Sequence, residues 1–201
     1  MDVGDVDPDP IVQVQRWLDD VVAADLPEPM AVVLCTVPAT AGAQPIARHV
    51  LLRGLDQRGF AFVSNRLSRK GRHLAENPRA CLVFPWFPIH RQVVVTGTVA
   101  DAGDADSDAY WATRPRGSQI AAMVSEQSRP IPDRASLERR FAEVGAEHEG
   151  KLIPRPPHWG MYRLAPDSIE LWSQGEHRMH DRLLYERDPA TGGWTITRLS
   201  P

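Results

Sequence analysis

The fold is decided by three neighbouring stretches of sequence, Arg48-His-Val-Leu-Leu-Arg53, Phe60-Ala-Phe-Val-Ser-Asn65 and Ser68-Arg-Lys-Gly71. The first two are apolar runs, and Asp56-Gln-Arg-Gly59 lies between them as a turn, so they are predicted to form a β-hairpin. Ser68 is a favourable N-cap, so the third stretch is predicted to begin a helix. A strand pair followed at once by a short helix is the element around which the rest of the chain is arranged.

The predicted helix start carries two basic residues. Arg69 and Lys70 fall in the first turn, where free backbone N–H groups and the helix dipole already favour an anion. Cations at this position oppose the dipole and are mildly destabilising unless an anion lies among them. The alternative is that both side chains simply stay solvated. We favour an anion site of phosphate size that also includes Arg48 and Ser68, with Arg53 at the end of its strand.

Size and composition limit the class of protein. The chain has 201 residues, of which 42% are hydrophobic and 24% charged, and this fits one soluble domain with a substantial core. Its net charge of −3 argues against a general binder of nucleic acid or of anionic membranes, because no excess positive field is present. No apolar run is long enough to cross a bilayer.

The cysteines and the N-terminal residues favour a cytoplasmic protein. Cys35 and Cys81 lie in apolar runs without a partner at metal-ligand spacing, so we expect buried free thiols and no metal site. The N-terminal sequence lacks the order of basic and apolar residues that marks a signal peptide. Residues 1–10 contain four Asp and two Pro and are predicted to form a disordered arm, and residues 11–201 are predicted to form a single domain.

The remaining pattern is that of short strands with helices inserted between them. Further strands are predicted at 30–37, 79–86, 91–101, 159–164, 168–172, 183–187 and 194–199, and further helices at 11–22, 104–113, 118–125 and 133–148. This mostly β pattern with added helices predicts a small, mostly antiparallel barrel. A Rossmann fold is excluded, because regular strand–helix alternation and a Gly-rich turn are both absent.

A second group of candidate residues lies in Tyr110-Trp-Ala-Thr-Arg114-Pro-Arg-Gly-Ser118. Tyr110 and Arg114 are four residues apart and share a helix face, and Ser118 is predicted to cap the next helix. A phenol, a guanidinium and a hydroxyl at a helix start form a second cradle of phosphate size. The alternative, which this group alone would favour, is an ordinary helical turn with exposed arginines.

A third group lies in His177-Arg-Met-His-Asp-Arg182. In an extended segment, Arg178, His180 and Arg182 would point to one face. Three cationic or titratable groups on one face favour an anionic or electron-rich partner opposite them. A plain surface strand is an equally open alternative.

Several short motifs accompany these groups along the chain. They are Arg48-x-Val-Leu-Leu, Ser68-Arg-Lys-Gly, Asn77-Pro, Phe84-Pro-Trp, Arg91-Gln-Val, Arg114-Pro-Arg-x-Ser-Gln119, Ser125-x-Gln-Ser128, Trp159-Gly, Ile169-Glu-x-Trp172, His177-Arg-Met-His-Asp-Arg182 and Arg198-Leu-x-Pro201. In this order they resemble the pyridoxamine 5′-phosphate oxidase family over nearly the whole chain after Ile11. General flavin-binding split-barrel proteins lack the Arg-x-His-Asp-Arg segment, which makes the resemblance specific.

The resemblance implies an FMN-binding split β-barrel that forms a homodimer, with FMN at the subunit interface and residues 159–201 as the dimerisation and substrate segment. It implies that the following residues bind FMN: Arg48, Val50, Leu51, Ser64, Arg69, Lys70, Gln92, Gln127, Ser128, Trp172 and Arg182. It implies that the substrate is bound by Arg53, Tyr110, Arg114 and Ser118, with Arg178 and His180 covering the substrate ring as catalytic residues.

The implied activity is the oxidation of pyridoxamine or pyridoxine 5′-phosphate to pyridoxal 5′-phosphate, by hydride transfer to FMN. Dioxygen then reoxidises the cofactor and gives hydrogen peroxide. In such an enzyme the protein contributes orientation and electrostatics, and the redox chemistry belongs to the flavin.

The sequence departs from the family pattern at five places. Arg53 stands where the family usually has Lys, Val63-Ser64 replaces an aromatic or Thr pair, Trp159-Gly160-Met161 replaces Gly-Gly, Trp172-Ser-Gln-Gly175 differs from Trp-Gln-Gly, and the N-terminal arm is short. Two alternatives follow. One is a sister FMN-dependent oxidase of the phenazine-biosynthesis type, although such relatives tend to lose the Arg-Pro-Arg-x-Ser-Gln pattern. The other is a non-catalytic flavin- or pyridoxal phosphate-binding protein, against which the retained Arg178 and His180 argue.

Overall fold

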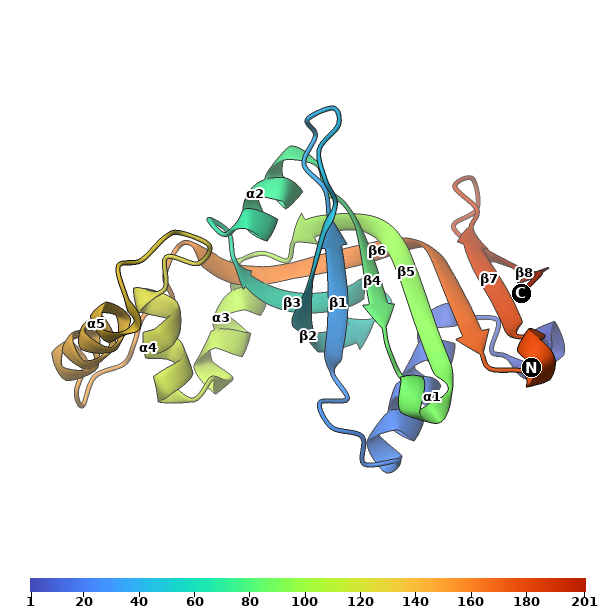
Figure 1. The fold of residues 1–201 in the computed structure, drawn as a ribbon, viewed down its shortest axis with the longest axis horizontal. Helices are drawn as coiled ribbons and strands as arrows, with labels where there is room; N and C mark the ends of the chain where they lie inside the picture. Colours follow the sequence, from blue (N-terminus) through green and yellow to red (C-terminus); the bar gives the residue numbers. More distant parts are fainter.

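The computed structural model describes residues 1–201 and contains an antiparallel sheet that closes into a barrel (Figure 1). The strands are β1 (Ala31–Thr36), β2 (Ile46–Asp56), β3 (Gly59–Asn65), β4 (Arg79–Phe84), β5 (Arg91–Asp101), β6 (Trp159–Ser173), β7 (Asp181–Arg187) and β8 (Trp194–Leu199). The helices are α1 (Pro10–Ala23), α2 (Arg69–Glu76), α3 (Asp104–Thr113), α4 (Arg116–Val124) and α5 (Arg134–Glu147), with 3₁₀ turns at Val3–Asp5, Phe87–Ile89 and Glu176–Arg178.

The strand order is β3-β2-β1-β4-β5-β6-β7-β8, and β3 also pairs with β6. Strands β1 to β6 therefore form a closed six-stranded barrel, and β7 and β8 extend the sheet beyond it. The expected mostly β barrel with added helices is confirmed. None of the helices is both long and apolar enough to span a lipid bilayer.

The barrel is filled by alternate side chains of its strands. Phe60, Phe62 and Phe84 are fully buried, and α1 adds Val14 and Val21 to the same core. Residues on one face of each strand point inward, as the period of two requires. The predicted hairpin is also present, because β2 ends at Asp56 and β3 begins at Gly59 with paired register.

Strand β6 is longer than the sequence suggests. The two strands predicted at 159–164 and 168–172 form one element, since Pro166 lies at a bulge in the β5–β6 pairing, where Gly97 faces Pro166 and Thr96 faces Ser168. A bulge tolerates the missing N–H of proline. A Cβ on Gly97 would lie 2.1 Å from the Ala165 carbonyl oxygen, so the close approach of the two strands requires glycine.

Helices α3, α4 and α5 form an appendage with a small core of their own, at the end of the molecule opposite β7 and β8 (Figure 1). The predicted cap at Ser118 is wrong. Pro115 is the N-cap of α4, and the Ser118 N–H already donates to the Pro115 carbonyl (2.8 Å). The fixed φ of proline starts the helix early, and Ser118 lies in its first turn.

The N-terminal residues are not the disordered arm that their composition predicts. Asp2 and Asp5 form a capping box on the first 3₁₀ turn, and Asp9 caps α1. The Tyr185 hydroxyl on β7 donates to the Asp7 carbonyl (2.8 Å), and Arg198 on β8 pairs with Asp2 (3.3 Å). The acidic side chains are used as caps and ion-pair partners, so they do not repel the segment from the barrel.

Candidate functional site

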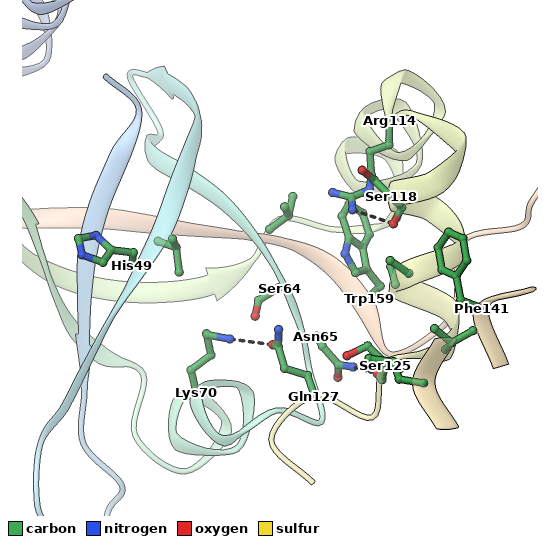
Figure 2. Close-up of a pocket in the computed structure, with 16 residues that line it drawn as sticks. His49, Ser64, Asn65, Lys70, Arg114, Ser118, Ser125, Gln127, Phe141 and Trp159 are labelled. Carbon is green, nitrogen blue, oxygen red and sulfur yellow. Dashed lines mark hydrogen bonds between the residues drawn. The ribbon is translucent and has the colours of Figure 1, made fainter. Parts of the chain in front are cut away.

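A cavity of about 510 Å³ separates the barrel from the helical appendage (Figure 2). Its volume lies in the range of small-molecule sites. Its lining comprises His49, Val50, Val63, Ser64, Asn65, Lys70, Arg114, Ser118, Ala121, Ala122, Val124, Ser125, Gln127, Leu137, Phe141 and Trp159. Six of the residues assigned by the family resemblance are among them, namely Val50, Ser64, Lys70, Arg114, Ser118 and Gln127.

The barrel side of the cavity is built at the start of α2. Ser68 is fully buried, and its hydroxyl accepts from the Gly71 N–H (3.3 Å), which confirms the predicted N-cap. The Lys70 ammonium donates to Gln127 Oε1 (2.8 Å), and the Arg69 N–H donates to Ser128 Oγ (3.2 Å). The loop after α4 is thus tied to the first turn of α2.

The cations at this helix start have no counter-charge within the chain. Arg48, Arg69 and Lys70 take part in none of the salt bridges of the structure. Burial and then the charge of Arg48 lower the pKa of Lys70 to about 8. Burial also lowers the pKa of Arg48, with a smaller effect from Arg69. Three neighbouring cations without a carboxylate fit a phosphate group, which would relieve their repulsion.

The opposite side of the cavity is a stack of rings and guanidinium groups. Trp159 stacks on Tyr110 (6.3 Å between ring centroids), and the Arg114 guanidinium lies 4.9 Å from the Trp159 ring. Arg114 Nη2 donates to the Ser118 carbonyl (3.0 Å), whereas its buried Nε has no partner. Arg53 lies 5.6 Å from the Tyr110 ring. Burial lowers the pKa of Arg114, with a further contribution from Arg53. The unpartnered Nε fits a second anion.

The third group of predicted residues lies away from the cavity, together with Gln92 and Trp172, which the resemblance assigns to FMN. Gln92, Trp172 and Arg182 are neighbours across β5, β6 and β7. His180 lies 4.7 Å from Trp172, and Arg182 is held by both carboxylate oxygens of Glu170 (2.8 and 3.1 Å). Strand β7 and the end of β6 that pairs with it lie at the end of the molecule away from α4 and α5 (Figure 1). Within one chain, the third group of residues therefore does not reach the cavity that Arg114 and Ser118 line.

The segment that carries Arg178 is a turn, so the prediction of an extended segment is wrong. His177 and Arg178 have positive φ angles of 53° and 65°. The chain folds back so tightly that a Cβ on Gly175 would lie 1.8 Å from the Met179 carbonyl oxygen. The Gly175 N–H donates to His180 Nδ1 (3.2 Å). Because Nδ1 accepts this bond, Nε2 is the ring nitrogen left to donate.

Some cavity residues were not assigned a role from the sequence. Asn65 ties the end of β3 to the Ser125 carbonyl (3.2 Å), and Phe141 and Leu137 of α5 close the cavity on the helical side. Trp159 appeared only as part of a motif. The large apolar residues of α5 were the one signal for these positions in the sequence. That signal could not assign a role, because an apolar side chain on a partly exposed helix face can equally be ordinary packing. Conversely, Arg48, Leu51, Arg69 and Ser128 adjoin the cavity residues in sequence but do not line the cavity.

The closed barrel and the unpaired cations define a split-barrel protein with a site that suits a phosphate group. A structure described as a pyridoxamine 5′-phosphate oxidase-related, FMN-binding protein from Nostoc punctiforme shares this fold, with a TM-score of 0.71 at 16% identity over 92% of this chain and 96% of that one. The structure of PhzG from Burkholderia lata 383, in complex with tetrahydrophenazine-1-carboxylic acid, has a TM-score of 0.90 at 33% identity, over 97% of this chain and 94% of that one.

Two family models match the chain. Residues 18–148 match the pyridoxamine 5′-phosphate oxidase model, and residues 159–201 match the pyridoxine 5′-phosphate oxidase C-terminal dimerisation region. A pyridoxine/pyridoxamine 5′-phosphate oxidase from Paraburkholderia phymatum is 51% identical over 201 residues, which are all of this chain and 93% of that protein. The chain belongs to the pyridoxamine 5′-phosphate oxidase family, and it is an FMN-dependent oxidoreductase.

Proposed function

We propose that the protein oxidises pyridoxamine 5′-phosphate or pyridoxine 5′-phosphate to pyridoxal 5′-phosphate. The observation that carries this proposal is the pair of cationic groups on opposite sides of one cavity (Figure 2). Lys70 lies on the barrel side and Arg114 on the helical side, and neither has a carboxylate partner. Two separate phosphate sites are what a phosphorylated cofactor and a phosphorylated substrate require.

In this proposal FMN lies on the barrel. Its phosphate contacts Arg48, Arg69 and Lys70, where the positive charge is uncompensated. Val50, Leu51, Ser64, Gln92, Gln127 and Ser128 would hold its ring system. Trp172 and Arg182 complete the flavin site from the β6–β7 end of the sheet. The fit rests on charge, because these cations have no carboxylate partner within the chain.

The substrate phosphate in turn contacts Tyr110, Arg114 and Ser118, with Arg53 beside them. Arg178 and His180 cover the substrate ring. Since β7 and the helical appendage lie at opposite ends of one chain, these two sets can meet only if two copies share each site. We therefore propose a homodimer with FMN at the subunit interface, and the match of residues 159–201 to a dimerisation region supports it.

The chemistry that FMN supplies is acceptance of a hydride equivalent from the substrate carbon that bears the amine or hydroxyl, with reoxidation by O₂ to give hydrogen peroxide. The protein holds the substrate in place through its remote phosphate, which aligns the reacting carbon without contact at that carbon. His180 presents an Nε2–H donor, because its Nδ1 is occupied by the Gly175 N–H. Arg178 adds a permanent positive charge over the ring.

An anaerobic spectrum of the FMN-loaded protein tests this proposal. Addition of pyridoxine or pyridoxamine 5′-phosphate should bleach the flavin absorbance, and admission of air should restore it with release of pyridoxal 5′-phosphate and peroxide. A flavin that is bound and stays oxidised with both substrates would contradict the proposal.

A sister oxidase that acts on another ring is the second candidate. The TM-score of 0.90 to a structure that holds a tetrahydrophenazine carboxylic acid favours it. The same spectrum separates the two candidates, because bleaching by a reduced phenazine carboxylic acid and not by the B6 phosphates would select the second. The complete Tyr110, Arg114 and Ser118 set favours the phosphorylated substrate.

The affinity for FMN should depend on pH through Lys70. In the free protein its pKa is about 8, so the ammonium is charged at pH 7 and mostly neutral at pH 9. The phosphate is already a dianion at pH 7, so loss of the Lys70 charge should raise the Kd for FMN by about tenfold between pH 7 and pH 9. Fluorescence quenching of FMN measures this, and a Lys70→Met variant should bind weakly with a flat profile. The same rise in that variant would assign the titration to another group.

A further inference from the structure

We infer that Thr36 and His73 are positioning residues for the Arg48 guanidinium, and that their hydrogen bonds set the selectivity of the protein for a phosphorylated flavin. This inference rests on the proposed placement of the FMN phosphate at Arg48, Arg69 and Lys70. Neither Thr36 nor His73 lines the cavity, and both act on the site through Arg48.

The three side chains form a continuous hydrogen-bonded series. Arg48 Nη1 donates to the Leu34 carbonyl (2.9 Å) and to Thr36 Oγ1 (2.8 Å), and Thr36 Oγ1 lies 3.2 Å from His73 Nδ1. Thr36 is 2% exposed and His73 is 9% exposed. The bonds are therefore shielded from water, where a lost partner is costly to replace.

The direction of each bond follows from what each group can do. A guanidinium only donates, so the Thr36 oxygen accepts from Arg48. The Thr36 hydroxyl proton then needs an acceptor, and His73 Nδ1 is the remaining group bonded to this oxygen. In this arrangement His73 Nδ1 accepts the hydroxyl proton, which leaves Nε2 as the ring nitrogen that can donate. The Thr36 hydroxyl thus both accepts and donates, and one end of the Arg48 guanidinium is held in place.

The series also joins the three elements that form the phosphate site. Thr36 ends β1, Arg48 lies on β2, and His73 lies in the last turn of α2, whose first turn holds Arg69 and Lys70. A long arginine side chain loses considerable rotamer freedom when it binds an anion. Holding Arg48 in advance reduces that cost, and the remaining guanidinium N–H groups have no protein partner.

The test compares Thr36→Val, which keeps the shape and removes the hydroxyl, with Thr36→Ser, which keeps the hydroxyl. Binding of FMN and of riboflavin is measured by fluorescence quenching, together with the thermal unfolding of the flavin-free protein. We expect Thr36→Val to raise the Kd for FMN by about tenfold and to leave the Kd for riboflavin within about twofold. Thr36→Ser should resemble the natural protein. A purely structural role would weaken both flavins alike.

Two further variants keep the test decisive if Thr36→Val folds poorly. His73→Asn retains an acceptor near the Nδ1 position, and His73→Phe removes it, so only the second should lose preference for FMN. Thr96→Val is the matched control, because the Thr96 hydroxyl bonds Ser168 Oγ (2.7 Å) on β6 and forms no hydrogen bond with Arg48.

An unchanged ratio of FMN to riboflavin affinity in both Thr36→Val and His73→Phe would overturn the inference. Equal losses in Thr36→Val and Thr36→Ser would overturn it as well, because the hydroxyl would not be the cause. If the natural protein itself showed no preference for FMN over riboflavin, the proposed phosphate site would be at fault. That outcome is distinct from the previous two.

Discussion

Replacement of Arg114 by methionine is expected to raise the KM for pyridoxine 5′-phosphate by about 10- to 100-fold, with a much smaller change in kcat. The Arg114 guanidinium carbon lies 4.9 Å from the centre of the Trp159 ring, and the buried Nε of Arg114 has no partner within the chain. Hydrogen bonds to a charged group contribute about 1.5–3 kcal/mol each, and the substrate phosphate would supply such bonds. Because the contact is remote from the reacting carbon, its loss weakens binding more than it slows the chemical step. Steady-state kinetics with varied substrate measure both constants.

Arg116 provides the matched control for this variant. It lies two residues further along, is exposed, and donates to the Lys151 (2.9 Å) and His148 carbonyls outside the cavity. Arg116→Met removes the same charge and a similar volume, and it should leave KM unchanged. An equal rise of KM in both variants would mean that the appendage had lost its packing, and the substrate role of Arg114 would be contradicted.

Much of the fold follows from local sequence. The hairpin and the Ser68 cap depend on residues close together in the chain, and both are present as predicted. The errors arise where tertiary structure overrides a local signal. Pro166 reads as a strand break but lies at a bulge, and the turn at Arg178 is imposed by the close approach of Gly175 to Met179. The N-terminal segment is held by groups on β7 and β8 that composition cannot reveal.

At the candidate site, too, local signals could be read from the sequence and long-range contacts could not. Arg69 and Lys70 could be assigned to an anion site because charge against a helix dipole is a local contradiction. The bonds from Arg48 to Thr36 and on to His73 join residues 12 and 37 positions apart, and nothing in their neighbourhoods signals them. The stacking of Arg114 on Trp159 is equally non-local. The sequence thus indicates candidate ligand-binding side chains, and the structure adds the side chains that hold them in place.

The division of the candidate residues between two ends of the chain leads to the last prediction. If each site combines the Arg114 side of one copy with the His180 side of another, two variants that are each impaired at a substrate concentration well below the natural KM should restore each other. Arg114→Met and His180→Ala, co-expressed with different affinity tags, should form heterodimers in which one site carries both changes and the other carries none. Random assortment gives half heterodimers with half of their sites intact, so the mixture should reach about a quarter of natural activity.

The control pairs two changes on the same side of the site. Arg114→Met with Tyr110→Phe should give no restoration, because both substitutions remove groups that one copy contributes to a site, and every site of every dimer carries one of them. The activity of the co-expressed mixture, measured at saturating FMN and at a substrate concentration well below the natural KM, distinguishes the cases. If the Arg114→Met and His180→Ala mixture stayed at the mean of the two separate variants, each site would belong to one copy. The β7 end of the chain would then have to reach the helical appendage by a rearrangement of the single chain, which the continuous β6 strand opposes.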